Sequence, residues 1–426
     1  MPTYAAFLGH LPRISIAELS AKIPNFLPEK TINNAVILFQ TDADLSQHNL
    51  QEWGGTILLA HELTRSTSVA LDDVPKILEK ELEKAKGKVI FSFRSIGLPT
   101  QKVKELYRHC KDHLRKKGRS SRYVGNERQA AATALLHDAG LLNPKEGCEL
   151  CLLAEEGFLW VGRTIAAQDP SAYTKRDMGK PVRDTRLGLL PPKLAQIMLN
   201  MGEWMIRTSE GGSRTSDEKK KPKKDPPLII FDPFCGMGVI PMEALLRGWT
   251  VLASDISERC ITGCEKNMDW LRKNEDITKT NVPSGVFKHD ARKAFVEDKL
   301  RAGKVKMRPN VIVTETHLGP PLTGRPNQRD VQKMRAENDA LQIDFLSNVA
   351  ESLPGVPVVA TWPVWFLKSG PVWLEQVLKH LPKLGYTLVL PPGTKAEHDR
   401  TSLVYRRPDQ IVGREMVLLK PTKGNK

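Results

Sequence analysis

The pattern of apolar and polar positions divides the chain into a first part of mixed short elements and a second part in which strands and helices alternate. In the first part, short apolar runs predict strands over residues 4–9, 35–39, 57–63, 88–94, 148–154 and 157–163. Helical spacing of apolar residues predicts helices over 14–21, 74–86, 101–117 and 126–138. These elements indicate two small α+β modules within residues 1–170.

After residue 170 the pattern changes to a basic, turn-rich connection, followed by a helix that begins at Pro191–Pro192. The segment 209–227 is rich in lysine and has few residues to bury, so it predicts a flexible insert. Beyond it, apolar runs predict strands over 228–231, 250–254, 285–288, 310–314, 356–361, 386–390 and 415–419. Strands and helices that alternate in this way predict an α/β doubly wound sheet, with its site at the carboxyl ends of the strands.

The composition of the chain indicates what kind of partner it binds. The 426 residues carry a formal net charge of +15, which points to a polyanion, with nucleic acid first and an acidic membrane second. Excess lysine that only aids solubility is the alternative. No apolar run reaches the length of a membrane helix, and residues 1–13 lack the pattern of a secretory signal.

Cysteine usage predicts reduced thiols in a cytosol, because a chain of this length has only six cysteines. Cys148 and Cys151 have the spacing of a metal or redox pair, but no second pair or histidine set completes a zinc site. Both lie in an apolar run, so we interpret them as buried strand residues and expect no metal.

The run 228–257 carries the candidate chemistry. A predicted strand ends on Asp232, a turn with Gly236 and Gly238 leads into a helix, and the next strand ends on Asp255. Glycines let the backbone approach a ligand closely, and an acid about 20 residues on is where such folds bind a ribose diol.

Two phosphate-binding patterns are absent from this turn, the G-x-G-x-x-G of dinucleotide folds and the Gly-Lys-Ser/Thr loop. Asp232 opens the turn instead, and an acid repels phosphate but binds an amino group. This combination suits S-adenosylmethionine (SAM), which has an amino-acid end, a sulfonium and a ribose. The alternative is an ordinary strand–turn–helix that contains glycines.

Two longer segments, Gly162–Met201 and the D-P-F-C-G-M-G run, resemble the THUMP-domain tRNA guanosine N2-methyltransferases, archaeal and eukaryotic enzymes that modify guanosine 10 of tRNA. The most specific parts are R-D-x-G-x-P-x-R-D (Arg176–Asp184) and G-x-L-P-P-K-L-A-Q (Gly188–Gln196). The resemblance implies a ferredoxin-like module over 1–60, a THUMP RNA-binding domain over 61–168 and a Rossmann-type methyltransferase domain over 169–426.

By this resemblance, specific residues match the SAM site. Asp232, Pro233, Cys235, Gly236 and Gly238 match the loop that faces the methionine part, and Asp255 with Ile256 matches the ribose-binding position. Asp290 and Ala291 match the segment whose acid bonds the adenine amine, and Leu190–Pro191 belongs to the element that closes over the cofactor. Asp290 also fits the N-terminus of a helix, which is the structural alternative.

The chain departs from the family at its catalytic loop. Where the family carries D-P-P-Y after the fourth strand, alignment on the strand places Glu315, Thr316, His317 and Leu318. Glu315 can accept a hydrogen bond from a base amine and His317 can stack on a base, while Leu318 replaces the family's aromatic residue. The three catalytic candidates are therefore Glu315, His317 and Leu318.

The predicted function is SAM-dependent methylation of the exocyclic N2 of a guanosine in tRNA. We expect phosphate contacts from a turn-like basic cluster, Lys116, Lys117, Arg119 and Arg122. Two alternatives stay open: a tRNA-binding protein without catalysis, such as a folding chaperone, and an amino-methyltransferase acting on another substrate. The sequence does not decide whether a small activator subunit takes part.

Overall fold

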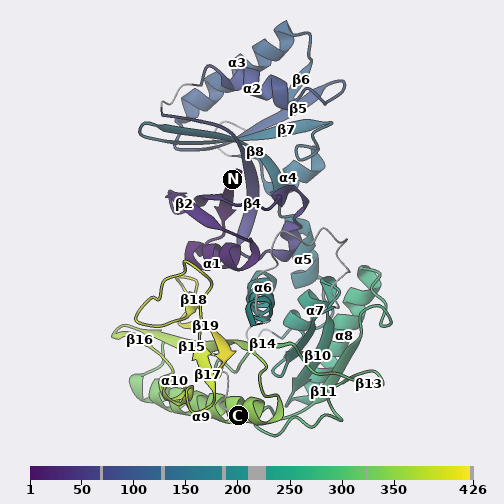
Figure 1. Ribbon diagram of the computed structural model, residues 1–426, viewed down its shortest axis with the longest axis vertical. Coiled ribbons are helices and arrows are strands. Elements are labelled where there is room, and N and C mark those ends of the chain that lie inside the picture. Colours follow the sequence, from purple (N-terminus) through teal and green to yellow (C-terminus); the bar gives the residue numbers. More distant parts are fainter. Residues whose placement is uncertain (68–70, 126–129, 185–188, 210–226, 323, 423–426) are drawn as a thin grey trace. The chain divides into compact units, whose positions relative to one another are not determined.

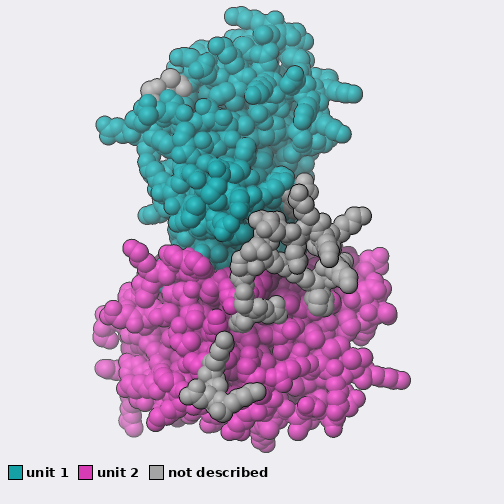
Figure 2. Space-filling view, in the orientation of Figure 1, with its two compact units in different colours: residues 1–174 teal, residues 175–426 magenta. Residues whose placement is uncertain are grey.

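The computed structural model describes residues 1–67, 71–125, 130–184, 189–209, 227–322 and 324–422 (Figure 1). The chain forms two compact units, residues 1–174 and 175–426 (Figure 2). The predicted Lys-rich insert falls almost wholly outside the described residues, as do the first four residues of the helix predicted over 126–138. In the described part of the chain, no helix combines the length and apolarity that crossing a membrane requires.

The first unit is built on one eight-stranded sheet, in the order β2-β3-β1-β4-β8-β7-β5-β6. Its strands are β1 (Thr3–Leu8), β2 (Leu27–Ile32), β3 (Val36–Gln40), β4 (Thr56–Ser66), β5 (Val89–Ile96), β6 (Ser121–Tyr123), β7 (Gly147–Glu155) and β8 (Phe158–Ala167). Its helices are α1 (Pro12–Lys22), α2 (Val74–Glu81), α3 (Thr100–Lys116), α4 (Thr133–Asp138) and two 3₁₀ turns at Leu45–Gln47 and Leu50–Glu52. Figure 1 shows α2 and α3 together on one side of this sheet.

Three apolar cores hold this unit together. Leu78 of α2 and Leu106 of α3 pack on Phe91 of β5, and Leu136 of α4 belongs to a second core with Leu38 and Trp160.

All ten strands and helices predicted for this part are present, but two of the helices are shorter than expected. Helix α4 begins at Thr133, after the described, non-helical residues 130–132, and α2 ends at Glu81, five residues early. Edge strand β2 was not predicted, because five of its six residues are exposed and no apolar alternation marks them. Cys148 and Cys151 are fully buried in β7, as predicted, and burial raises the pKa of the Cys148 thiol to about 12.

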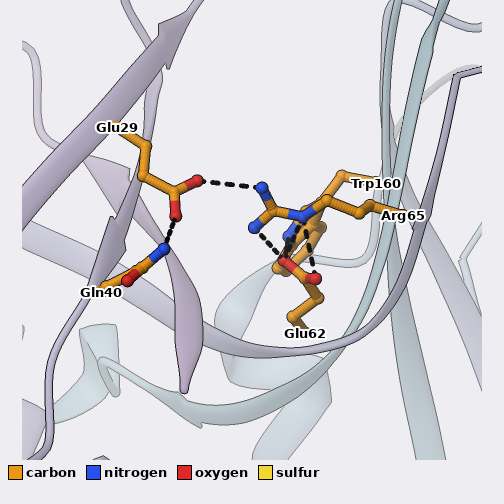
Figure 3. A network of polar contacts seen from close by, with 5 residues as sticks. All are labelled: Glu29, Gln40, Glu62, Arg65 and Trp160. Atoms are coloured by element: carbon orange, nitrogen blue, oxygen red, sulfur yellow. Dashed lines mark hydrogen bonds and ion pairs between the residues drawn. The ribbon is translucent and has the colours of Figure 1, made fainter. Parts of the chain in front are cut away.

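A polar network joins β2 and β3, at one edge of this sheet, to the central strands β4 and β8 (Figure 3). Glu62 of β4 accepts hydrogen bonds from Trp160 Nε1 (2.6 Å) and Arg65 Nε (2.9 Å). Arg65 Nη1 pairs with Glu29 of β2 (3.1 Å), which also accepts from Gln40 Nε2 of β3 (2.6 Å). The network ties residues of the predicted ferredoxin-like module to residues of the predicted THUMP domain, and the boundary at residue 60 stays a prediction.

The second unit contains a mixed sheet in the order β11-β10-β9-β14-β15-β19-β17. Its strands are β9 (Ile229–Asp232), β10 (Thr250–Asp255), β11 (Ser284–Lys288), β12 (Arg301–Ala302), β13 (Val305–Lys306), β14 (Val311–Glu315), β15 (Val358–Leu367), β16 (Gly370–Val372), β17 (Tyr386–Leu388), β18 (Leu403–Tyr405) and β19 (Val412–Pro421). Its helices are α6 (Pro192–Ser209), α7 (Val239–Leu246), α8 (Glu258–Asn274), α9 (Gln328–Ser352) and α10 (Gln376–His380).

This sheet is the Rossmann-type α/β fold that the sequence predicts, and all seven predicted strands are present. Strands β11, β10, β9, β14 and β15 run parallel, while β19 runs antiparallel to β15 and β17. Phe345 and Leu346 of α9 pack with Ile312 of β14 in an apolar core of this unit. The order reverses beside β9, which is the position where doubly wound sheets bind ligands.

One prediction for the connection between the two parts is wrong. Residues Pro170–Met178 form a helix, α5, where the sequence pattern predicts turns. The missed signal is local: Pro170 occupies the first helical position, and Asp169 Oδ1 accepts a hydrogen bond from Ser171 N (2.8 Å).

Candidate active site

A cavity of about 440 Å³ lies at the carboxyl ends of β9, β10 and β14, beside the point of order reversal. Five carboxylates line it, together with apolar side chains and the backbone of the glycine turn. The acids come from five separate segments: Asp184, Asp232, Asp255, Asp290 and Glu315. Parallel strands explain this convergence, because their carboxyl ends share one edge of the sheet.

The turn after β9 has the conformation for which its glycines are needed. Gly236 has φ +48° and Gly238 has φ +81°, values that residues with a Cβ seldom adopt. A Cβ on Gly238 would lie 2.8 Å from Cys264 Sγ, so this glycine serves packing against α8. A Cβ on Gly236 would meet no atom within 4 Å, so its backbone is open to the cavity.

Asp232 is the most perturbed acid of the cavity. It is 1% exposed, and its Oδ1 accepts hydrogen bonds from Thr314 Oγ1 (2.7 Å) and Phe234 N (3.2 Å). Burial raises the pKa of Asp232 to about 8, against the opposing effect of these two hydrogen bonds. No basic side chain among the described residues pairs with it, so a cationic group of a ligand would find an uncompensated acid here.

Asp255 closes the other side of the turn. Its Oδ2 accepts a hydrogen bond from Gly236 N (3.1 Å), and its Oδ1 accepts one from Ser257 N (2.9 Å). The next residue, Ile256, is 58% exposed and lines the cavity. An acid beside an exposed apolar side chain offers a hydrogen-bond acceptor next to a surface for a flat ring.

Asp290 follows β11 and is held by its own loop. Its carboxylate accepts two hydrogen bonds from the Arg292 guanidinium (2.9 and 2.8 Å) and one from Arg292 N (3.1 Å). These contacts, the side-chain bonds first, lower the pKa of Asp290. Ala291, beside it, is buried and also lines the cavity.

Glu315 ends β14 and has a partner that the sequence did not indicate. Its Oε1 accepts a hydrogen bond from Arg414 Nε of β19 at 2.5 Å, and its side chain is 15% exposed. Burial raises the pKa of Glu315, and the charge and hydrogen bond of Arg414 oppose this effect.

The residues after Glu315 form a loop with a fixed start. Thr316 is 2% exposed, its Oγ1 donates to Thr361 O (2.8 Å), and it accepts from Gln342 Nε2 (2.8 Å). His317 and Leu318 follow, and both line the cavity. Desolvation lowers the pKa of the exposed His317 ring, which favours its neutral form.

The segment before α6 contributes Asp184, which sequence reasoning missed, and Leu190, which the family resemblance indicated. Asp184 is 5% exposed, lines the cavity and pairs with Arg259 of α8, whose Nη2 lies 2.7 Å from Asp184 Oδ2. Leu190 lines the cavity as well. Asp184 stands in the R-D-x-G-x-P-x-R-D motif, so the motif itself was the available signal.

Buried polar contacts hold this motif against the glycine turn. Asn267 of α8 is fully buried, donates to Val182 O (2.9 Å) and Met237 O (2.8 Å), and accepts from Val182 N (2.9 Å). Arg176 Nε pairs with Glu243 of α7 at 2.9 Å. The motif is thus anchored to both helices that flank the turn, α7 and α8.

The structure brings together most of the predicted site residues. The cavity is lined by Leu190, Asp232, Pro233, Cys235, Gly236, Asp255, Ile256, Asp290, Ala291, Glu315, His317 and Leu318. Pro191 and Gly238 do not line it: Pro191 O accepts from Leu194 N at the start of α6, and Gly238 is the N-cap of α7.

The predicted RNA-binding residues divide into two groups. Arg119 Nη2 donates to Ala85 O (2.7 Å) and Leu82 O (3.3 Å) after α2, and Lys117 Nζ lies 3.3 Å from Glu79 Oε1. Lys116 and Arg122 are exposed, and neither charge is paired with another side chain in the part of the chain that the structure describes. Arg122 lies in β6, so the segment is a helix end and a strand where a turn was expected.

Comparisons with known proteins place the chain among distant structural neighbours. No family model matches the sequence, and no curated protein matches it. Similar solved structures include TrmN from Thermus thermophilus, with 15% identity, coverage of 99% of this chain and 100% of that chain, and a TM-score of 0.49. A possible methylase from Clostridium difficile 630 has 12% identity, coverage of 100% and 99%, and a TM-score of 0.45.

A third neighbour matches over a smaller share of this chain. Magnesium protoporphyrin IX methyltransferase from Synechocystis PCC 6803, solved with bound SAM, has 14% identity, coverage of 60% of this chain and 99% of that chain, and a TM-score of 0.32. Identities and scores of this size assign neither activity nor substrate, which have to be argued from the residues of the cavity.

Proposed function

We propose that the protein is a SAM-dependent tRNA methyltransferase that modifies the exocyclic N2 of a guanosine. The observation that carries this proposal is the meeting of Glu315 with Asp232, Asp255 and Asp290 around one cavity at the switch point of the sheet. The three aspartates suit binding of SAM, and Glu315 suits the amino group that accepts the methyl.

The hydrogen-bond donors and the ammonium group of SAM match the acids that line the cavity. Asp232 would bind the cationic amino group, Asp255 the ribose diol and Asp290 the adenine amine, while Ile256 offers an apolar edge to the adenine ring. Asp232 lacks a basic partner among the described residues, so an ammonium group there would favour its ionised form. The open backbone at Gly236 leaves room for close approach of the methionine part.

When bound, SAM supplies a methyl group whose transfer forms a C–N bond, breaks the S–C bond with its electron pair kept by sulfur, and releases one proton from nitrogen. Glu315 accepts a hydrogen bond from the target N–H, which orients the nitrogen and stabilises the positive charge that develops there. The proton then passes to solvent. His317 offers an exposed, largely neutral ring against which the extruded base could stack.

The choice of guanine over adenine follows from the acceptor character of Glu315. An ionised carboxylate only accepts hydrogen bonds, and guanine presents two neighbouring donors, N1–H and N2–H₂. Adenine presents its N6 amine beside N1, a lone-pair acceptor that a carboxylate repels. Guanosine at position 10 is implied by the family resemblance alone.

A second candidate is tRNA binding without catalysis, which the replacement of the family's aromatic residue by Leu318 favours. Incubation of the full chain with labelled SAM and unmodified tRNA, followed by nuclease digestion, separates these candidates. N2-methylguanosine supports the proposal, and N6-methyladenosine refutes the choice of base. Binding of both SAM and tRNA without any methylated nucleoside supports the second candidate.

A further inference from the structure

Arg414 reaches the cavity acid from a strand that is not its neighbour. Strand β15 lies between β14 and β19, with Thr361 opposite Glu315 and Pro363 opposite Arg414. Neighbouring strands lie about 4.8 Å apart, so the Arg414 side chain has to extend across β15 to bring Nε to 2.5 Å from Glu315 Oε1. The residue is 5% exposed, and an arginine buried at this depth is held there by its partner.

We infer that Arg414 is a positioning residue, which holds Oε1 of Glu315 so that Oε2 is left to accept a hydrogen bond from the amine of the target base. This inference rests on the proposed methyl transfer. Within the described residues, Arg414 is the hydrogen-bond partner of Glu315, and Oε2 accepts from none of them. One oxygen is therefore fixed, while Glu315 still lines the cavity.

The charge of Arg414 has a second consequence for Glu315. The cavity also contains other ionisable groups, and Glu315 helps to raise the pKa of one of them, Asp232. These groups include Asp184, Asp232, Asp255, Asp290, His317, Arg259 and Arg292. Arg259 and Arg292 pair with Asp184 and Asp290, so Arg414 is the cation that contacts Glu315, and it stays charged at every physiological pH. Without it, Glu315 would keep a proton to a higher pH and would present a donor where the mechanism requires an acceptor.

A second buried ion pair on the same strand provides a matched control. Glu415 is 1% exposed and pairs with Arg400, whose Nε and Nη2 lie 2.6 and 2.8 Å from its two oxygens. Adjacent strand residues point to opposite faces of a sheet, and neither Arg400 nor Glu415 lines the cavity. Arg400→Met therefore breaks a comparable ion pair without a change at Glu315.

The test compares Arg414→Met with Arg400→Met in single-turnover methylation of tRNA at saturating SAM from pH 5 to 9. We expect Arg414→Met to lower the rate at pH 7 at least about tenfold and to move the acid limb of the profile upward by about one pH unit or more. Arg400→Met should leave the acid limb of the pH–rate profile unmoved, although it lowers the stability measured in urea. Arg414→Lys, which retains the charge, should restore the position of the limb.

Equal losses in the two methionine variants, with unmoved acid limbs, would overturn the role of Arg414 and leave the proposed function intact. If Arg414→Met does not fold, Arg414→Lys decides, because loss of the fixed Nε contact should lower its rate while the limb stays in place. A parental rate for Arg414→Lys then refutes positioning. No methyl transfer by the parent protein at any pH refutes the proposed function and this inference with it.

Discussion

Removal of the Asn267 side chain should release the R-D-x-G-x-P-x-R-D motif, at Val182, from the glycine turn, at Met237. Asn267→Ala deletes two donated and one accepted hydrogen bond, at 2.8 to 2.9 Å, and leaves polar backbone atoms of Val182 and Met237 without these partners. Each buried group left unsatisfied costs about 1 kcal/mol or more, so three bonds predict a loss of about 3 kcal/mol in the free energy of unfolding. Equilibrium unfolding in urea measures this loss directly.

The same helix offers a matched control. Asn274 is exposed at the end of α8, and among the described residues its side chain bonds only to Trp270 O one turn earlier (2.9 Å). We expect Asn274→Ala to change stability by less than about 0.5 kcal/mol. A difference between the two variants of less than 1 kcal/mol, a threshold set by one buried bond, would refute the reasoning from hydrogen bonds.

A second measurement links this clamp to ligand binding. Since Val182 precedes the cavity residue Asp184 and Met237 lies in the turn itself, loosening both should weaken S-adenosylhomocysteine binding about tenfold by calorimetry, or about 1.4 kcal/mol. Unchanged affinity alongside the predicted loss of stability would mean that the clamp serves folding alone.

Three further predictions concern single groups. Asp232 should keep its proton up to about pH 8 in the native state but release it near pH 4 in the unfolded chain. The free energy of unfolding should therefore fall as pH rises between these values, and Asp232→Asn should remove that slope in urea titrations. Asp255→Ala should weaken SAM binding about tenfold by calorimetry, the loss of one charge-assisted diol contact, and unchanged affinity would exclude Asp255 from the site. Replacement of Lys116 and Arg122 by alanine should lower tRNA affinity and the salt dependence of binding, and a fall in affinity at constant salt slope would contradict phosphate contact.

The sheet of the second unit could be predicted because its central strands are buried on both faces. Such strands appear in the sequence as continuous apolar runs, and strands β9, β10, β11 and β14 begin and end within two residues of expectation. The prediction stopped short on β15, which runs on to Leu367 through Pro363, because a proline inside an apolar run is normally a sign that a strand ends.

A local pattern predicts only those cavity residues that are close in sequence, whereas Leu190, Asp290, Glu315 and His317 were indicated by the family resemblance. Asp232, Gly236 and Asp255 fall within one strand–turn–helix–strand unit, whose local pattern has a chemical meaning of its own. Arg414 is 99 residues from Glu315, and no local pattern indicates that their side chains meet. The same holds for Arg119 of the basic cluster, whose carbonyl partners follow α2 and are not indicated by any local pattern, while RNA binding by the cluster stays a prediction.

The loop after β14 differs from the D-P-P-Y of the family that the sequence resembles, but it keeps an acid at the first position, with Glu315 in place of aspartate. Glutamate is one methylene longer than aspartate, and this reach allows Glu315 to share one oxygen with Arg414 while it still lines the cavity. The loop start is held by Thr316, which is bonded to both β15 and α9, so the acid has a fixed backbone below it. In the proposed methyl transfer, Leu318 therefore offers no aromatic ring for the target base, and the exposed ring of His317, one residue earlier, lines the same cavity and would take that role.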